Sequence, residues 1–116
     1  MFISSLLSEG YHRDRISLEQ LARVLCENNA ETYGIYPRKG AIQVGSDADF
    51  ALVDVEQERV VTPEHMQSAA DWGLYDGWNL KGWPTHTIVR GEVVMQHGEI
   101  VGSPEHGQYI ARPPVD

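Results

Sequence analysis

The sequence predicts an α+β fold, with a helix in the first third of the chain and hairpin-forming strands after it. Apolar residues recur at helical spacing between Leu18 and Tyr33, whereas short β-prone runs alternate with glycine turns from residue 37 onward. A chain of 116 residues is long enough for one domain with a modest core and too short for two ordinary ones. We therefore expect one α+β unit.

The helix is the clearest local prediction, because both of its ends are marked. Ser17 is a natural N-cap, Gln20 stands at the third helical position of a capping box, and Ile16 with Leu21 can form a hydrophobic staple. Gly34 is expected to end the helix. The apolar stripe between these ends consists of Leu18, Leu21, Ala22, Leu25 and Cys26.

The first strand follows a glycine-punctuated stretch. The run Phe50–Val55 is β-prone and apolar except for Asp54, which predicts a buried strand, and a short strand is expected around Val60-Val61. Thr62-Pro63-Glu64 is typical of a helix start with proline at the first position, so a brief helix is expected there.

The strongest β signal comes late in the chain. The runs Thr85–Val89, Glu92–Gln96 and Glu99–Val101 are separated by the pairs Arg90-Gly91 and His97-Gly98. A residue followed by glycine at this spacing favours tight hairpin turns. After Gly102 the periodicity ends, and we expect the tail to run over the surface.

Charge and composition exclude several classes of partner. The net charge of −8 disfavours nucleic acid, because binding to phosphates depends on Lys and Arg, and the basic pairs Arg13/Arg15 and Arg38/Lys39 form no patch. The N-terminal segment has neither a basic region nor the length of a signal peptide or membrane span. Cys26 has no intrachain disulfide partner, which agrees with a cytoplasmic location.

No residue of this chain is predicted to be catalytic, cofactor-binding or metal-ligating. The five histidines show no His-x-His or His-Glu-x-x-His spacing, so surface and turn positions are expected for His12, His65, His86, His97 and His106. Three carboxylates near the first strand are better explained as turn residues that accept local backbone N–H groups than as an acid/base pair or a cation site. These are Asp47, Asp49 and Asp54.

Four aromatic residues form the one unusual run of the sequence, and they are either a surface that seeks a partner or the covered edge of a core. They are Trp72, Tyr75, Trp78 and Trp83.

Several motifs, in this order, resemble the C-terminal part of cyclic amidohydrolases, the group of hydantoinase, dihydropyrimidinase, allantoinase and dihydroorotase. Ile16–Leu21 with Glu27–Ala30 is similar to the last barrel helix of that family, although Asn29 stands where the family usually has proline. Pro37–Ile42 and Gly45–Phe50 are similar to its lysine-glycine and glycine-to-aspartate turns. The closing segment Asp76–Pro84, followed by Thr87–Val94, resembles its final hairpin.

The resemblance implies a fragment that holds the last TIM-barrel helix and the C-terminal strands of a small β-sandwich. On this basis we expect a barrel-helix region over 1–36, the sandwich part with its connecting segment over 37–102, and a tail over 103–116. The family's two divalent metal ions, with zinc expected, and its carboxylated lysine would be held by residues upstream of this chain. We therefore expect no cofactor here, and either self-association or the missing barrel as the partner.

Two alternatives remain open at this level. The chain can be a free-standing interaction module that binds through the stretch Trp72 to Trp83, or part of a related deaminase with a similar small domain. The substrate ring is chosen by barrel loops outside this chain.

Overall fold

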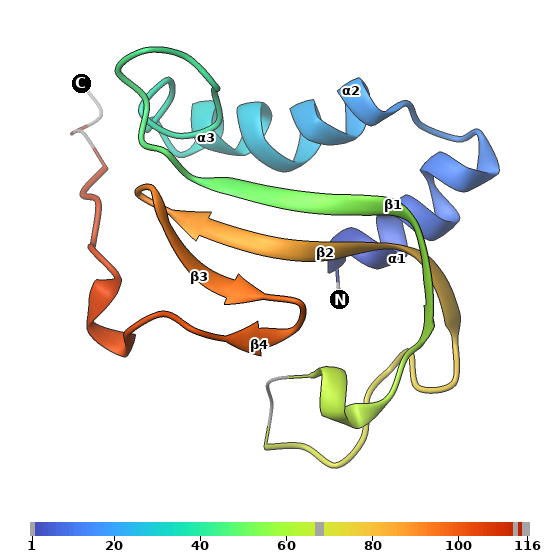
Figure 1. Cartoon of the computed structure of the whole chain (residues 1–116). Coiled ribbons are helices and arrows are strands. Elements are labelled where there is room, and N and C mark those ends of the chain that lie inside the picture. The colour runs from blue at the N-terminus through green and yellow to red at the C-terminus, as the bar shows by residue number, and fades with distance from the viewer. Residues whose placement is uncertain (1, 67–68, 113, 115–116) are drawn as a thin grey trace.

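A four-stranded antiparallel sheet forms the centre of the structure, with the strands in the order β1-β2-β3-β4 (Figure 1). Each strand therefore pairs with its neighbour in the sequence. This computed structural model describes residues 2–66, 69–112 and 114. The strands are β1 (Phe50–Val60), β2 (Asn79–Val89), β3 (Glu92–Gln96) and β4 (Glu99–Ile100).

The two late hairpins are confirmed. In the turn between β2 and β3, Arg90 and Gly91 have φ values of 48° and 81°, and in the turn between β3 and β4, His97 and Gly98 have φ values of 49° and 89°. Two successive residues with positive φ match the twist of antiparallel strands and are the hallmark of a tight two-residue turn. The residue-plus-glycine pairs thus set the register next to each turn, and the β2–β3 ladder shifts between Thr87 and Ile88.

The first strand is longer and more exposed than the sequence predicted. β1 continues through Val60, and none of its residues is buried, so the prediction of a buried strand over Phe50–Val55 was wrong. From Val53 onward, half-buried and exposed residues alternate. This alternation arises because successive side chains of a strand point to opposite faces of the sheet, and one face of an antiparallel sheet can remain open to solvent.

The second strand begins six residues earlier than the predicted Thr85. The sequence hid this start, because Gly82 and Pro84 are residues that usually interrupt strands. The ladder shifts register here: Val53 pairs with Pro84, whereas Leu52 pairs with His86. Thr85 is thus the extra residue of a bulge, and such a bulge is one of the places where a strand tolerates proline.

The predicted helix is confirmed over residues 18–32, but its middle is not α-helical. It consists of α2 (Leu18–Ala22), the π-helical segment η2 (Arg23–Glu27) and α3 (Asn28–Thr32). The capping box is present: the Ser17 hydroxyl accepts from the Gln20 N–H (3.2 Å), and the Ser17 N–H donates to Gln20 Oε1 (3.0 Å). Gly34, with a φ of 68°, follows its C-terminus as predicted.

A side chain stabilises the wide turn of this helix. In η2 the Asn28 N–H bonds to the Arg23 carbonyl, five residues back. The side-chain amide of Asn29 donates to the carbonyls of Val24 (3.1 Å) and Leu25 (2.9 Å). Asn29 therefore provides donors for carbonyls beside the π turn.

The structure contains a helix that the sequence did not predict, α1 (Phe2–Glu9). The helix packs against β2 (Figure 1), and its buried Leu7 lies against Gly82. The described part of the chain also contains three short 3₁₀ helices, namely η1 (Tyr11–Arg13), η3 (Pro63–His65) and η4 (Pro104–His106). η3 is the brief helix expected after Thr62.

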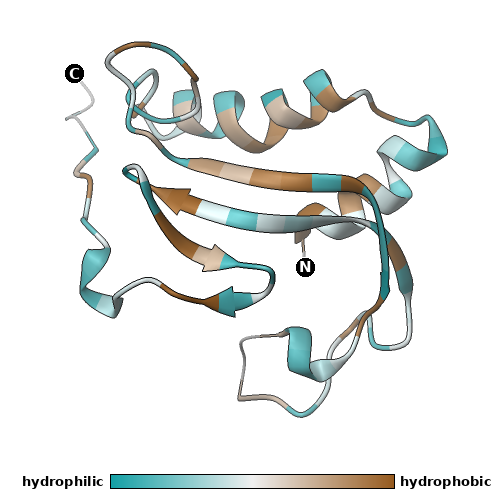
Figure 2. Ribbon diagram, in the orientation of Figure 1, coloured by the Kyte–Doolittle hydropathy of each residue, from teal (hydrophilic) through white to brown (hydrophobic). Residues whose placement is uncertain are grey.

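The core is small and lies beside β2. Val61, Leu80 and Trp83 are buried against one another, and Tyr75 packs against them. The Trp83 indole N–H donates to the Leu80 carbonyl (2.8 Å), so this buried polar group is satisfied. Apolar residues also lie along β1 and on the helix that runs beside it (Figure 2), where they form a second apolar surface.

Candidate functional site

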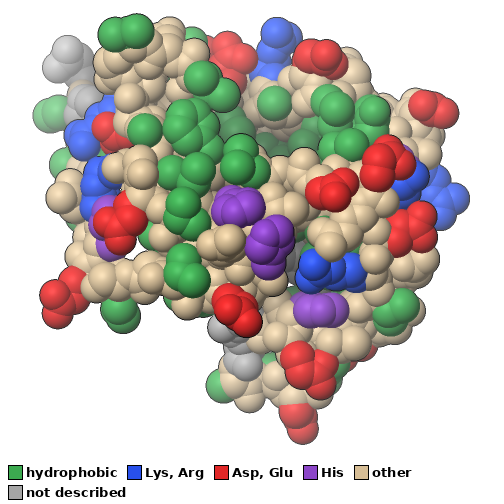
Figure 3. All heavy atoms as spheres, viewed as in Figure 1, with side chains coloured by type: hydrophobic (Ala, Val, Ile, Leu, Met, Phe, Trp, Pro, Cys, Tyr) green, Lys and Arg blue, Asp and Glu red, His purple; other side chains and the backbone are tan. Residues whose placement is uncertain are grey.

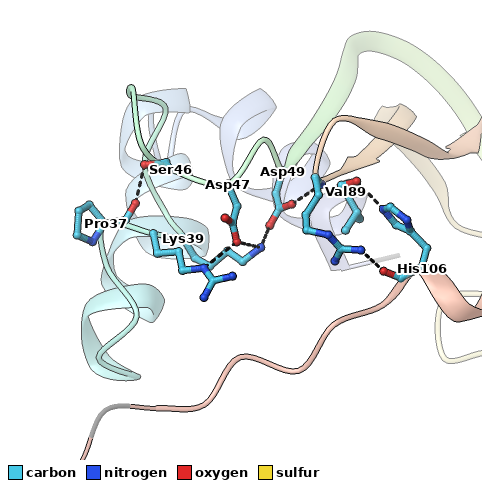
Figure 4. Close-up of polar contacts among 9 residues, drawn as sticks. Pro37, Lys39, Ser46, Asp47, Asp49, Val89 and His106 are labelled. Atoms are coloured by element: carbon cyan, nitrogen blue, oxygen red, sulfur yellow. Dashed lines mark hydrogen bonds and ion pairs between the residues drawn. The ribbon is translucent and has the colours of Figure 1, made fainter.

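A group of paired polar side chains surrounds Lys39, in the loop that joins α3 to β1 (Figure 4). The Lys39 ammonium contacts Asp47 (2.9 Å) and Asp49. The Arg38 guanidinium Nε lies 3.1 Å from the same Asp47 Oδ2. Ser46 closes the loop, because its hydroxyl donates to the Pro37 carbonyl (2.6 Å).

Asp49 connects this loop to the sheet and, through Arg90, to the C-terminal tail. Asp49 Oδ1 accepts the Arg90 N–H (2.8 Å) in the β2–β3 turn. The Arg90 guanidinium donates to the His106 carbonyl in η4. The His106 ring donates from Nε2 to the Val89 carbonyl (2.8 Å). Three segments that are distant in the sequence are thus joined (Figure 4).

The charges of this network stabilise one another. The Lys39 hydrogen bond, helped by Arg38, lowers the pKa of Asp47. Burial opposes ionisation of Asp49, but Lys39 and the Arg90 N–H outweigh burial and lower the pKa of this carboxyl. Burial likewise opposes the charge of Lys39, and the two aspartates outweigh it and raise the pKa of the ammonium. All three groups are therefore charged at neutral pH.

The sequence identified the role of these carboxylates but not all of their partners. Asp54 does accept local backbone N–H groups, from Glu56 (3.0 Å) and Gln57 (3.2 Å). For Asp47 and Asp49 the local prediction was wrong, because their side-chain partners are cations and a distant backbone N–H. The sequence did mark a lysine-glycine turn at Lys39, which could have indicated a cation near these aspartates. Lys39 and Asp49 are distant in the sequence, so no local pattern predicted their pairing.

The histidines are distributed over separate parts of the fold. His12 donates from Nε2 to the Val55 carbonyl (2.7 Å) on β1, and the His65 ring lies 5.3 Å from the Trp83 ring. His86 and His97 are brought together, with ring centroids 5.0 Å apart. The sequence placed His86 on a strand and His97 in a turn, and both placements are confirmed, but it missed their contact.

The described residues do not fit a two-metal site. Among residues 2–66, 69–112 and 114, no three His, Cys, Asp or Glu side chains are grouped so that they could hold a metal ion. Cys26 lies on the helix as predicted, but its thiol is exposed although it belongs to the apolar stripe.

An open apolar groove of about 880 Å³ runs between the helix and β1 (Figure 3). Helix residues such as Leu21 and Leu25 line one wall, and β1 residues such as Leu52 and Val53 line the other. The Lys39 network borders it, because Asp47 and Asp49 also contribute to the lining. The groove has the apolar lining that would suit contact with another protein segment.

The aromatic run is divided between the core and the surface. Trp83 is buried, whereas Trp72 is 69% exposed and Trp78 is 49% exposed. Tyr75 and Trp78 meet edge to face, with ring centroids 5.4 Å apart. Trp83 thus belongs to the covered edge of the core, whereas Trp72 and Trp78 remain exposed.

In the described part of the chain, every helix is too short or too polar to cross a lipid bilayer.

Comparison with known proteins agrees with the geometry. A family model described as the amidohydrolase family matches residues 1–94. The chain is 39% identical over 107 residues to an L-hydantoinase of Paenarthrobacter aurescens. The aligned region covers 92% of the chain and 23% of the relative. The chain is also 37% identical over 110 residues to a D-hydantoinase of Geobacillus stearothermophilus. This aligned region covers 95% of the chain and 23% of that relative.

A solved structure supports the same likeness. A crystal structure of a D-hydantoinase superposes with a TM-score of 0.91 at 38% identity and covers 96% of this chain and 24% of that one. The chain thus spans about a quarter of the length of the proteins it matches. The resemblance indicated by the ordered motifs and the expectation of a helix followed by antiparallel strands are both confirmed.

Proposed function

Because the chain belongs to the amidohydrolase family, we propose that it is the non-catalytic scaffold portion of an enzyme that hydrolyses the C–N bond of a cyclic amide. The observation that carries this proposal is the extent of the similarity. Hydantoinases match 92% and 95% of the chain at 37–39% identity, so no large part of it is left for a separate function. The deaminase alternative has no comparable support among these relatives.

The scaffold role is supported by how the polar side chains are used. Lys39, Asp47 and Asp49 are paired with one another, and Asp49, Arg90 and His106 join the loop, the sheet and the tail. Groups that are bound to each other in this way hold segments together, whereas a general acid or base must be free to contact a substrate. We therefore assign the network a structural role, which is to hold the loop, the sheet and the tail together.

The apolar groove supports the second half of the proposal. Relatives are about four times longer than this chain, and the groove offers the kind of surface on which the remaining part of such a fold would pack. We propose that a barrel covers the groove and that further strands complete a β-sandwich with this sheet. The two metal ions implied by the family, with zinc expected, would then be held by barrel residues and not by this chain.

A chimera tests the proposal most directly. Residues 1–112 would replace the matching segment of the Geobacillus D-hydantoinase, and hydrolysis of hydantoin and dihydrouracil would be compared with the parent enzyme. If the segment is scaffold, kcat falls little and the substrate preference is unchanged. A folded chimera that loses hydrolysis, or changes its preference between the two rings, would contradict the proposal.

The chain alone gives the complementary measurement. We expect no hydrolysis of either ring by the 116-residue chain with zinc added, at concentrations where the chimera is active. Turnover by the chain that disappears in a Cys26→Ser variant or any other single variant of this chain would assign catalysis to it and refute the scaffold role.

A second candidate is an interaction module, which the exposure of Trp72, Leu74 and Trp78 favours. In the chimera, replacing Trp72 and Leu74 with serine would leave hydrolysis and oligomeric state unchanged if these side chains serve a separate partner. Loss of assembly or of hydrolysis would instead assign them to the enzyme's own scaffold. We also propose a cytoplasmic location, on the ground that Cys26 is a free thiol.

A further inference from the structure

His86 and His97 meet on the surface of the sheet although they lie eleven positions apart. His86 is in β2, and His97 is in the turn between β3 and β4. Their ring centroids are 5.0 Å apart and their planes are inclined by 67°. The backbone holds them in place, because the His97 N–H donates to the Thr85 carbonyl (2.7 Å), directly before His86. Histidine side chains lie next to one another on the open face in Figure 3.

From this pairing we propose that His86 and His97 form a two-imidazole binding site for a divalent late transition-metal ion such as Zn²⁺, Ni²⁺ or Cu²⁺. Neutral imidazole nitrogen is a preferred ligand of these ions, whereas Mg²⁺ prefers oxygen. The site is separate from the metals implied by the family, and it does not depend on the proposed hydrolase activity.

The separation of the rings fits shared coordination. A zinc ion binds imidazole nitrogen at about 2.0–2.1 Å, and two such ligands at a tetrahedral ion have their ring centroids roughly 5 Å apart. The observed 5.0 Å therefore requires rotation of the rings but no movement of the strands. Ring rotation is inexpensive, because the χ2 angle of histidine has broad minima.

The hydrogen bonds around the pair leave nitrogen atoms available. His86 Nδ1 lies 3.1 Å from the Thr85 hydroxyl, which occupies this nitrogen and leaves Nε2 to bind the ion. A partner on the second nitrogen is the usual way in which proteins orient a metal-binding histidine. His97 is exposed and His86 is half-buried, so an ion can reach both from solvent.

Two protein ligands leave the remaining coordination positions to water. No third His, Cys, Asp or Glu joins this pair within the described ranges. The site is accordingly one for reversible binding of an ion with open positions, unlike a closed structural zinc site with four protein ligands. The chain's net charge of −8 further favours association with a cation.

The test uses the 116-residue chain with Zn²⁺ alone as the probe in isothermal titration calorimetry. We expect one ion per chain and at least a tenfold weaker affinity in either His86→Asn or His97→Asn, because the second ring no longer chelates the ion. The Zn²⁺ affinity of the double variant should be about the same as that of either single variant. His97→Asn is a mild change, since asparagine tolerates the positive φ of this turn.

His65→Asn is the matched control, because His65 is also exposed but lies against Trp83 and not beside another histidine. It should bind Zn²⁺ as the unmodified chain does. Substoichiometric Cu²⁺ should also broaden the imidazole NMR signals of His86 and His97 before those of His65. Equal loss in all three single variants, or unchanged affinity in His97→Asn, would overturn the proposal.

A second measurement separates a folded site from histidines in a flexible chain. In 6 M guanidinium chloride the strands no longer hold the rings together, so the affinity should fall to that of the single variants. If the affinity is the same with and without denaturant, the fold does not build the site and the proposal fails.

Discussion

Gly82 lies directly beneath Leu7, and the contact is so close that a side chain on the glycine would collide with it. A Cβ atom at Gly82 would stand 2.7 Å from Leu7 Cβ and 2.9 Å from Leu7 Cδ1. Gly82 also has a φ of 100°, which side chains rarely adopt. The docking of α1 on β2 thus depends on the absence of a side chain at one position.

Gly82→Ala should destabilise the chain by about 2–5 kcal/mol, from the positive φ and from overpacking against Leu7 together. Urea denaturation measures the loss. Gly98→Ala is the matched control, because Gly98 also has a positive φ, 89°, but nothing lies within 4 Å of its Cβ position. Equal losses in the two variants would show that the contact with Leu7 contributes nothing.

Leu80→Ala should cost about 2–5 kcal/mol, because Leu80 is fully buried and the change leaves a cavity against Val61 and Trp83. Thermal unfolding followed by circular dichroism gives the comparison. Leu74→Ala removes the same atoms at a side chain that is 75% exposed, and its effect should stay within about 0.5 kcal/mol. A large effect at Leu74 would indicate that this loop is covered in solution.

Asn29→Ala should lower stability by about 1 kcal/mol relative to Asn28→Ala, as two side-chain hydrogen bonds to helix carbonyls are lost. The neighbouring Asn28→Ala serves as reference because it makes the same gain in helix propensity. Urea denaturation of both variants gives the difference. Equal stability of the two would mean that the amide of Asn29 does not support the π turn.

Asp49→Asn should destabilise the chain at pH 7, and the difference from the unmodified chain should shrink as the pH falls. The folded-state pKa of Asp49 is lowered, so its ionic contribution is complete above the ordinary aspartate pKa of about 4 and is lost as the pH falls through the lower folded-state value. Chemical denaturation between pH 7 and pH 2.5 follows the change.

The exposed Asp71→Asn provides the control for Asp49→Asn, because it alters the net charge equally. Its effect at pH 7 should be within about 0.5 kcal/mol. A deficit in Asp49→Asn that persists unchanged at pH 2.5 would show that the carboxylate charge, and hence its pairing with Lys39, contributes nothing.

The 116-residue chain should self-associate at micromolar concentration, because β1 presents an edge of eleven residues and the groove beside it is apolar. Sedimentation velocity should show oligomers that Leu52→Lys weakens. Val44→Lys, at a fully exposed loop position, should not. A monomer in the unmodified chain would contradict this prediction.

Sequence reasoning succeeded where the structure is determined locally. The capping box at Ser17 and the turn at Arg90-Gly91 involve residues three positions apart or fewer, so the pattern itself contains the contact. The ordered motifs also gave the family, since they preserve the spacing of a longer fold.

It failed where distant segments meet. The pairing of Lys39 with Asp49 and the contact of His86 with His97 depend on how the sheet brings loops together, which no local period encodes. Strand β2 was shortened in the prediction because Pro84 and Gly82 ordinarily break strands, and only the bulge and the packing of Leu7 make them acceptable here.

The π-helical segment also determines which way the end of the helix faces. Leu21 and Ala30 are both buried, yet nine residues of regular α-helix would turn them about 180° apart. One additional residue in the wide turn reduces that angle to about 80°, which returns Ala30 towards the side of Leu21. The wide turn thus absorbs one residue: removing a single residue between Arg23 and Glu27 would restore a regular α-helix and leave Ala30 on the same side as before.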